Sequence, residues 1–182
     1  YDNERPSHKA FLQSFSLCNH PVTNGQFLEF IQDGGYQNAN LWHSDGWDFI
    51  NREKIKAPLY WFNWDNTWVN AGLQGIQKIN PHQTLSHVSY FEASAYACWK
   101  GKRLPTEKEW EKAARGSDGR RYVWGNQPVG GEGDCTRAVM MRAGVGLGCG
   151  HDGTGPVGQK PAGNSAYGVM NMVGNVWKWT AD

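Results

Sequence analysis

One short segment, Gly101–Gly116, constrains the fold of this chain most, because both ends of a helix are specified within it. Thr106 and Glu109 have the T-x-x-E spacing of a capping box, in which each side chain accepts a hydrogen bond from the other residue's backbone N–H. Apolar residues then recur three and four positions apart and give the helix one buried face: Trp110, Ala113 and Ala114. Gly116 can end the helix in a left-handed conformation. The segment therefore predicts an amphipathic helix that begins at Thr106.

Two further helices carry comparable signals. Thr23 can cap a helix over residues 23–33, and the two glycines that follow can end it. Ser89 and Glu92 form a second capping box, which predicts a helix over residues 89–100. With the helix after Thr106, about three short helices are expected.

The rest of the chain favours strands, turns and ordered loops. Apolar and polar residues alternate over residues 8–18 and again over 170–180, and this alternation predicts two strands. Residues 36–70 are dense in Trp, Asn and Asp and predict an ordered loop region with short strands, whereas Gly, Pro and Asn over 117–168 predict turns. We expect an α+β fold with little regular secondary structure, formed as a single domain over residues 1–182.

Composition argues against several classes of partner. The chain has 18 Lys and Arg against 17 Asp and Glu, and this net charge of +1 gives no electrostatic footprint for nucleic acid or an anionic membrane. No apolar run approaches the roughly 20 residues that a transmembrane helix needs. We therefore expect a cytoplasmic protein that binds neither nucleic acid nor membrane. Its 10 Trp and 23 Gly are typical of a loop-rich fold whose backbone is held by large aromatic side chains.

The four cysteines form no metal or redox motif. Cys18 and Cys98 lie in predicted regular elements and are interpreted as small buried hydrophobic residues. Cys135 and Cys149 flank a Gly-rich loop, and their spacing leaves open whether they form a disulfide, which would favour an oxidising compartment. Because there is no C-x-x-C pair, a zinc or thioredoxin-type site has no support.

Four segments resemble the formylglycine-generating-enzyme/sulfatase-modifying-factor family, and they occur in the order found in that family. They are G-K-R-L-P-T-E-K-E-W-E-K-A-A-R-G at 101–116, Y-V-W-G-N at 122–126, G-P-V-G at 155–158 and Y-G-V-M-N-M-V-G-N-V-W-K-W-T-A-D at 167–182. The resemblance implies the C-type-lectin-like fold, an α+β domain that is poor in regular structure.

The first half of the chain resembles one branch of this family, the C-terminal domain of the iron-dependent sulfoxide synthases of ergothioneine biosynthesis. The matching segments are D-N-E-R-P-S-H at 2–8, H-P-V-T-N-G-Q-F-L-E-F-I-Q-D-G-G-Y at 20–36, L-W-H-S-D-G-W at 41–47, A-P-L-Y-W at 57–61 and H-V-S-Y-F-E-A-S-A-Y-A at 87–97. The resemblance implies the substrate-binding domain of a non-haem iron oxidoreductase that joins a thiol to a histidine betaine, trimethylhistidine, as a sulfoxide.

The metal-binding and catalytic residues of that branch have no counterparts in this chain. The branch holds iron with three His, two of them in an H-x-x-x-H-x-E helix of an upstream domain, and the six His here (8, 20, 43, 82, 87 and 151) lack that spacing. Its reactive tyrosine lies beyond the position of Asp182. We therefore expect a domain that is incomplete at its C-terminus, lacks the iron-binding domain and is inactive alone. The expected partners are small-molecule substrates and that upstream domain; no catalytic residue is assigned.

The resemblance also implies a calcium site near the last predicted strand, with the pattern N-x-x-G-x-x-x-E. Asn171, Gly174 and Val176 occupy the first three ligand positions, but Lys178 stands where the family has Glu. An ammonium group only donates hydrogen bonds, whereas Ca²⁺ requires oxygen ligands. We therefore expect this site to hold no calcium and Lys178 to take the place of the ion.

A second calcium site of the family has a counterpart in Asp152, within H-D-G-T. The resemblance adds backbone oxygens near Thr154 and Arg137 to this site. The alternative interpretation, that Asp152 forms a turn before Gly153, stays open.

Two other functions stay open as well. A formylglycine-generating oxidase that acts on a sulfatase cysteine would use a copper-binding cysteine pair near its C-terminus, and Cys135 and Cys149 precede the final strand motif, so they are not that pair. A non-catalytic, lectin-like ligand-binding module is the third reading, since fold does not fix function.

Aromatic faces can bind quaternary ammonium groups. For most of the Trp-rich stretch, however, packing in the core or against loops is the favoured interpretation; its members are Trp42, Trp47, Trp61, Trp64 and Trp68.

Overall fold

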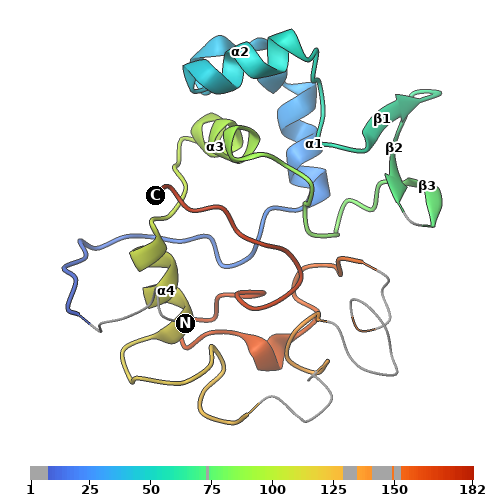
Figure 1. Cartoon of the computed structure of the whole chain (residues 1–182). Helices are drawn as coiled ribbons and strands as arrows, with labels where there is room; N and C mark the ends of the chain where they lie inside the picture. The colour runs from blue at the N-terminus through green and yellow to red at the C-terminus, as the bar shows by residue number, and fades with distance from the viewer. Residues whose placement is uncertain (1–7, 73, 129–134, 141–148, 150–152) are drawn as a thin grey trace.

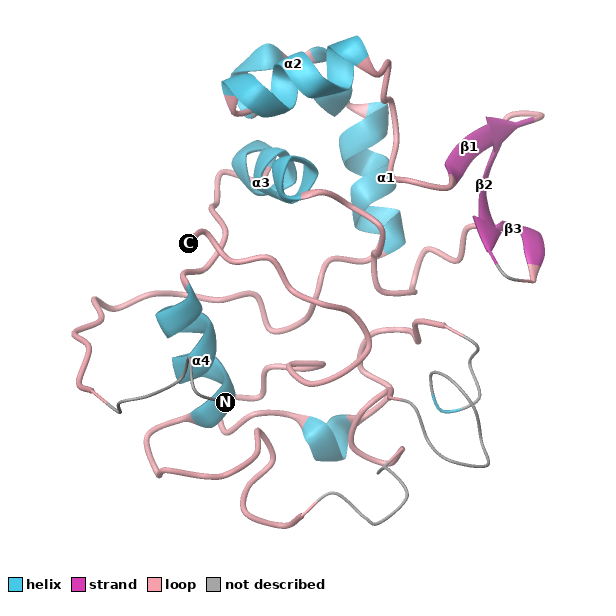
Figure 2. Ribbon diagram, in the orientation of Figure 1, coloured by secondary structure: helices cyan, strands magenta, loops and turns pink. Residues whose placement is uncertain are grey.

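The computed structural model describes residues 8–72, 74–128, 135–140, 149 and 153–182. Within these residues, four α-helices and one small sheet are joined by long loops (Figures 1 and 2). The helices are α1 (Asn24–Gln32), α2 (Ser44–Arg52), α3 (Tyr90–Trp99) and α4 (Glu107–Arg115), with short 3-10 helices at Gly35–Gln37, Ala39–Leu41 and Pro161–Gly163. The strands are β1 (Trp61–Trp64), β2 (Thr67–Gly72) and β3 (Gly75–Lys78). The expected α+β composition is confirmed.

Capping boxes begin three of the helices, two of which the sequence predicted as such; at α1 only the cap by Thr23 was predicted. The reciprocal hydrogen bonds are present at the start of α1, at Ser89 and Glu92 of α3, and at Thr106 and Glu109 of α4. The guanidinium of Arg103 adds two hydrogen bonds of 2.7 Å to the Glu109 carboxylate. The same carboxylate therefore caps α4 and ties the preceding loop to it.

The fourth helix, α2, was not predicted, because its sequence signals are weak. His43 at its N-cap makes no side-chain capping bond. Its buried face consists of Gly46 and Ile50, and the backbone at Gly46 lies so close to α3 that an added Cβ would be 2.6 Å from Cγ of Phe91. Glycine has no apolar side chain, so a helix that packs through Gly46 does not show the usual spacing of apolar residues in its sequence.

The three strands form an antiparallel sheet in the order β1-β2-β3, which projects from the helical part of the molecule (Figure 1). Trp61 pairs with Asn70, and Val69 pairs with Lys78. The turn between β1 and β2 places two residues at positive φ, Asp65 at 46° and Asn66 at 59°. Two such residues match the right-handed twist of a tight hairpin.

The strands predicted over residues 8–18 and 170–180 are not formed, so that prediction was wrong. Residues 8–18 have no regular structure, and in the second segment the only ladder contact among described residues is an isolated bridge between Gly174 and Val139. Alternation indicates which faces a strand would bury, but a strand also requires a partner for its backbone N–H and C=O groups.

Buried apolar side chains form two separate clusters. The larger one joins α1 and α3 to the 36–50 region and contains Phe27, Phe30, Tyr36, Trp42, Ile50, Ala95 and Tyr96. The smaller one surrounds α4 and contains Ala113, Ala114, Val123, Val169 and Met172. In the larger cluster, Phe27 stacks on Tyr96 with ring centroids 5.5 Å apart. Aromatic packing of this kind holds the helices together in place of an extensive sheet.

Candidate functional site

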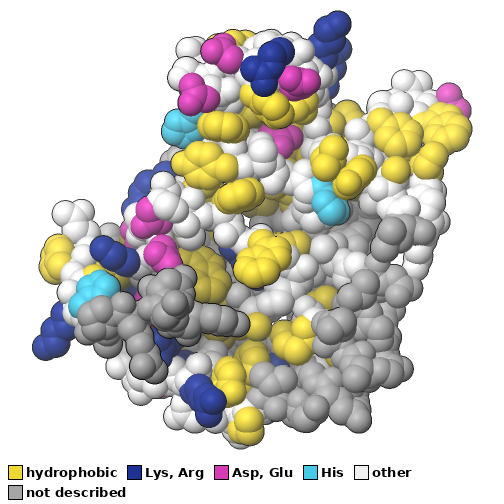
Figure 3. Space-filling view, in the orientation of Figure 1, with side chains coloured by type: hydrophobic (Ala, Val, Ile, Leu, Met, Phe, Trp, Pro, Cys, Tyr) yellow, Lys and Arg dark blue, Asp and Glu magenta, His cyan; other side chains and the backbone are white. Residues whose placement is uncertain are grey.

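Five rings from distant parts of the chain form two contacting groups beside the start of α3, His43–Tyr90–Trp179 and Tyr60–His87, which together we call the aromatic surface. The ring centroids of Tyr60 and His87 lie 5.1 Å apart, those of His43 and Tyr90 lie 5.9 Å apart, and those of Tyr90 and Trp179 lie 6.1 Å apart. Figure 3 shows hydrophobic and histidine side chains gathered on one face, around α3 and the C-terminal segment.

Two side-chain hydrogen bonds connect the rings of this surface to neighbouring elements. Nε1 of Trp179 donates to the carbonyl oxygen of Val88 at 3.0 Å, and this bond joins the C-terminal segment to the loop before α3. Nε2 of His43 lies 2.9 Å from Oγ of Ser94, which connects the start of α2 to α3. The rings are thus positioned by α2, by α3 and by the last described segment at the same time.

Two members of the aromatic surface have an unusual backbone conformation. Tyr60 has φ of 72° and His87 has φ of 61°, in the left-handed region that bulky residues seldom adopt. The backbone N–H of Leu59 donates to the carbonyl oxygen of His87 at 3.1 Å and holds the two strained turns against each other. Such outliers cluster at ligand-binding and active sites, where the surrounding structure maintains the strain.

The chemistry of this surface suits an organic cation. Tyr60 is 52% exposed and Trp179 is 49% exposed, so their ring faces are accessible. The face of an aromatic ring carries partial negative charge and attracts a cation placed over it. The arrangement can therefore bind a positively charged group by ring faces.

The Trp residues considered from sequence lie elsewhere. Trp42 and Trp61 are buried, and Nε1 of Trp42 donates to the carbonyl oxygen of Gly35 at 2.8 Å. Trp64 is exposed on the projecting sheet and stacks on Phe62. Trp47 and Trp68 are partly buried. Most of these Trp side chains pack in the core or against loops. The sequence analysis considered these Trp residues and not the rings of the aromatic surface, so it missed that surface. Four of its five rings lie within the branch-like segments at 41–47, 57–61 and 87–97, and that was the available signal.

The first set of calcium-type positions forms a tight loop that Lys178 enters. Nζ of Lys178 donates to the carbonyl oxygen of Gly174 at 2.7 Å, and burial lowers the pKa of this lysine to about 8. Oδ1 of Asn171 accepts a hydrogen bond of 3.3 Å from the backbone N–H of Gly158. Val176 supplies a backbone N–H that also donates to Gly174 at 2.9 Å. The loop presents an ammonium group to the carbonyl oxygen that would face a cation, and this donor set does not fit Ca²⁺.

The second calcium-type residue, Asp152, lies outside the described residues. Nearby, the carbonyl oxygen of Thr154 accepts a hydrogen bond from Nε2 of Gln83.

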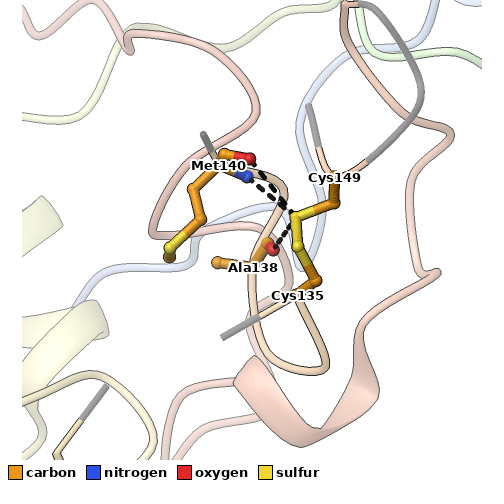
Figure 4. The surroundings of a disulfide bond; sticks show 4 residues. All are labelled: Cys135, Ala138, Met140 and Cys149. Carbon is orange, nitrogen blue, oxygen red and sulfur yellow. Dashed lines mark hydrogen bonds between the residues drawn. A yellow bond between two sulfur atoms is a disulfide. The ribbon is translucent and has the colours of Figure 1, made fainter. Parts of the chain in front are cut away.

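The structure contains a disulfide between Cys135 and Cys149, the bond that spacing alone left open (Figure 4). Sγ of Cys149 lies 3.3 Å from the carbonyl oxygen of Met140 and 3.4 Å from that of Ala138.

The remaining cysteines differ from the sequence interpretation. Cys18 and Cys98 are exposed thiols, not buried hydrophobic residues. Sγ of Cys18 lies 3.4 Å from Nζ of Lys102. Cys98 is exposed on the outer side of α3. Membership of a predicted strand or helix could not tell an outward-facing side chain from an inward-facing one.

A metal-binding cluster is not found in the part of the chain that the structure describes: no three His, Cys, Asp or Glu side chains come together there. The described residues therefore do not fit the iron that the branch resemblance implies. In the same part of the chain, every helix is too short or too polar to cross a bilayer.

Comparison with known proteins shows the class to which this fold and site belong. The model of the sulfatase-modifying factor enzyme 1-like domain matches residues 1–182, and the chain belongs to this family. The family has the C-type-lectin-like fold, so the fold expected from the sequence motifs is confirmed.

Within the family, the chain is similar to two kinds of enzyme. It is 42% identical to the hercynine oxygenase of Mycobacterium tuberculosis over 98% of this chain and 40% of that protein. It is 32% identical to the formylglycine-generating enzyme of Mycobacterium tuberculosis over 99% of this chain and 67% of that protein, and 34% identical to that of Thermomonospora curvata over 100% and 64%. The chain thus spans about 40% of the length of the hercynine oxygenases that it matches.

Proposed function

We propose that this chain is the substrate-binding domain of a non-haem iron sulfoxide synthase of the ergothioneine type, and that its aromatic surface holds the trimethylammonium group of a histidine betaine. One observation carries the proposal: three separate segments that resemble this branch converge in space to supply His43, Tyr60, His87 and Tyr90. The identity of 42% to a hercynine oxygenase supports the same reading.

The proposed ligand matches the surface chemically. A trimethylammonium group cannot donate an N–H hydrogen bond, so ring faces are a suitable means of recognising its charge. Cation–π contacts contribute about 0.5–1 kcal/mol at exposed sites and about 2 kcal/mol when desolvated, and loss of one ring should weaken binding roughly 2- to 30-fold. The thiol substrate and its contacts are not assigned to particular residues.

Iron, which would activate oxygen in such an enzyme, is assigned to a part of the polypeptide outside this chain. The assignment rests on the resemblance to a branch whose iron ligands lie in an upstream domain, and the chain spans only 40% of a hercynine oxygenase that it matches. We place no chemical step on this domain. Its proposed role is to bind and orient the betaine beside the domain that carries the metal.

Binding of the histidine betaine (trimethylhistidine, or hercynine), measured by calorimetry, tests the role of the aromatic surface. We expect hercynine to bind more tightly than histidine, and Tyr90→Leu and Trp179→Leu each to weaken hercynine binding within the range above. Trp64→Leu is the matched control, because Trp64 is an exposed aromatic residue on the sheet, outside the aromatic surface. Equal affinity of all four proteins for hercynine would remove the aromatic surface from the proposal.

Activity of the full-length polypeptide tests the reaction separately. We expect bound iron and oxygen uptake that requires both a thiol and hercynine, with a sulfoxide as the product. Bound iron without such turnover would contradict the sulfoxide-synthase assignment, even where hercynine binds.

Formylglycine generation is the second candidate, favoured by identities of 32% and 34% to enzymes of that name. Conversion of cysteine to formylglycine in a sulfatase-derived peptide by the full-length polypeptide would favour it. Of the cysteines that the structure describes, Cys135 and Cys149 are joined in a disulfide, and Cys18 and Cys98 lie on separate elements. None of these forms an open thiol pair for a copper ion.

A further inference from the structure

Two consecutive residues hold the last described segment to two different parts of the fold. Nζ of Lys178 donates to the carbonyl oxygen of Gly174 at 2.7 Å, within residues 171–176, which we call the calcium-type loop. Nε1 of the next residue, Trp179, donates to the carbonyl oxygen of Val88 at 3.0 Å, beside the start of α3. Because Trp179 is a member of the aromatic surface, the segment connects that surface to the calcium-type loop.

The atom that anchors Lys178 is firmly held. Gly174 has φ of +71°, and a Cβ added to it would lie 2.3 Å from the carbonyl oxygen of Val139. The backbone N–H of the next residue, Asn175, donates to Val139 at 2.8 Å, and its side-chain amide donates to the buried hydroxyl of Thr84 at 2.8 Å. The carbonyl oxygen that receives the Lys178 ammonium is therefore fixed by contacts with residues far away in the sequence.

Trp179 is held less firmly than this anchor. Its side chain is 49% exposed, and its ring meets that of Tyr90 edge-on, with centroids 6.1 Å apart. A ring that is half exposed gains only part of the stabilisation that full burial would give. Its position therefore depends strongly on where the backbone places it.

The side chains around Trp179 make Lys178 its main anchor. Trp177 is 101% exposed, so its side chain does not fix the segment. The hydroxyl of Thr180 donates to the carbonyl oxygen of Asp182, which belongs to the same segment. A hydrogen bond from a charged donor is roughly twice as strong as one between neutral groups, so the bond of Lys178 is stronger than that of the Trp179 indole.

We propose that Lys178 is a positioning residue for the aromatic surface. Its bond to the calcium-type loop keeps the indole of Trp179 in place beside α3, and this position favours binding of the betaine. The second part of the inference rests on the proposed function. Lys178 is assigned no contact with the ligand, because its Nζ is bonded to the calcium-type loop.

A direct electrostatic effect of Lys178 would have the opposite sign. Its ammonium group and the trimethylammonium group of the betaine carry like charges, so removal of the lysine charge would strengthen binding if repulsion dominated. Under the positioning role, removal of the same group weakens binding. The sign of the change therefore separates the two effects.

Exchange of the Trp179 indole N–H, measured by NMR in the full-length polypeptide without ligand, tests the positioning role alone. Lys178→Met keeps a long unbranched side chain but cannot donate to the loop. It should speed the exchange roughly 2- to 10-fold, as expected for the loss of one net hydrogen bond. Lys78→Met is the matched control, because Lys78 is exposed on β3 of the projecting sheet, and it should leave the exchange unchanged.

The comparison requires folded variants. Slowly exchanging backbone amides of α1 show that a variant is folded. Lys178→Gln is measured in parallel as a second replacement that removes the charge, with the same direction of change expected. Indole exchange at the parent rate in the folded variants would overturn the positioning role, whatever their affinity for hercynine.

A double-mutant cycle in hercynine binding, measured by calorimetry, tests the second part. Lys178→Met should weaken binding by up to the roughly 2- to 30-fold loss expected for the ring itself. In a Trp179→Leu background the same substitution should cause no further loss, because the ring that it positions is absent. Tighter binding in Lys178→Met, or an equal loss with and without the indole, would overturn the inference.

The outcomes separate this inference from the proposed function. If Trp179→Leu weakens hercynine binding and folded Lys178→Met does not, the inference alone is overturned. If neither Tyr90→Leu nor Trp179→Leu weakens binding, the proposed role of the aromatic surface fails, and the effect of Lys178 on binding fails with it. Indole exchange decides the positioning of Trp179 in either case.

Discussion

Nζ of Lys178 and the carbonyl oxygen of Gly174 are 2.7 Å apart, joined by a hydrogen bond inside the last loop of the chain. Gly174 is fixed at this point because its φ is +71° and an added Cβ would lie 2.3 Å from the carbonyl oxygen of Val139. The loop therefore closes around a covalently attached ammonium group. Since burial lowers the pKa of Lys178 only to about 8, the group is largely charged at neutral pH.

This relationship predicts how the loop responds to calcium. Lys178→Glu replaces the ammonium with a carboxylate and should make the thermal unfolding midpoint depend on calcium, with about 2.7 kcal/mol of stabilisation at a concentration 100-fold above Kd. Lys178→Met, which removes the charge and adds no ligand, should stay insensitive. Both are measured in an Asp152→Asn background to exclude the other calcium-type residue. A calcium response of the Lys178 protein in this background that disappears in Asn171→Ala would contradict our reading.

The cap of α4 predicts a pH dependence of stability. Hydrogen bonds from Arg103 and from Thr106 lower the pKa of Glu109 to about 2, below the ordinary value of 4.5. A carboxyl group with a depressed folded-state pKa stabilises the fold above its unfolded-state pKa and loses that contribution as the pH falls through its folded-state pKa. The urea midpoint should therefore fall between about pH 4.5 and pH 2, and Glu109→Gln should flatten part of that fall.

Asp118→Asn provides the comparison for this pH experiment. Arg120 lowers the pKa of Asp118 from the ordinary value of 3.8 to about 2, so the contribution of Asp118 should be lost over the lower part of the same pH range. Each single variant should retain the contribution of the other group. If the Glu109→Gln midpoint fell with pH as steeply as the parent midpoint, the cap would contribute no pH-dependent stability.

Burial predicts the cost of losing an aromatic ring from the larger cluster. Phe27 is 0% exposed and lies against Phe30 and Tyr96, with centroids 5.1 and 5.5 Å away. Phe27→Ala should lower the free energy of unfolding by about 3–5 kcal/mol, measured by urea titration. Phe11→Ala makes the same chemical change at a ring that is 88% exposed and should stay within about 0.5 kcal/mol of the parent. Equal losses at the two sites would show that Phe27 is not a core residue.

The disulfide predicts a loss of stability on reduction. Cys135 and Cys149 are 14 positions apart. A disulfide that closes a loop of about 15 residues restricts the unfolded chain and thereby raises the free energy of unfolding by about 3 kcal/mol. The double substitution Cys135→Ser and Cys149→Ser should lower the free energy of unfolding by up to that amount. Alkylation without reductant should label Cys18 and Cys98 only, as mass spectrometry can verify. Labelling of all four cysteines in freshly prepared folded protein would contradict the bond.

Local sequence signals predicted the elements that depend on local contacts. Thr106 and Glu109 are three positions apart, so their mutual capping is settled within one turn of helix, and α4 begins where the sequence indicates. Ser89 and Glu92 act in the same way at α3. The helix α2 lacks such a cap and packs through Gly46, whose contact with Phe91 joins residues 45 positions apart. No pattern within a short window contains that contact.

The candidate site could be predicted only in fragments. The segments that contain His43, Tyr60 and Tyr90 were recognisable by resemblance, but nothing in their spacing showed that their rings would meet. The exposed and buried members of the Trp-rich stretch were equally indistinguishable, because Trp61 and Trp64 differ by the side of a strand and by what covers it. Lys178 is the exception: the replacement of a carboxylate by an ammonium group is visible in the sequence itself.

The sequence by itself determined the family, three of the helices and the altered charge at the calcium-type loop, because motifs, caps and charges are properties of neighbouring residues. Only the tertiary structure decided that the rings of the aromatic surface come together, that Cys135 and Cys149 are bonded, and that residues 9–18 pair with no strand among the described residues. Each of these depends on which distant segments lie together. That choice is made by the packing of the whole chain, which no local pattern encodes.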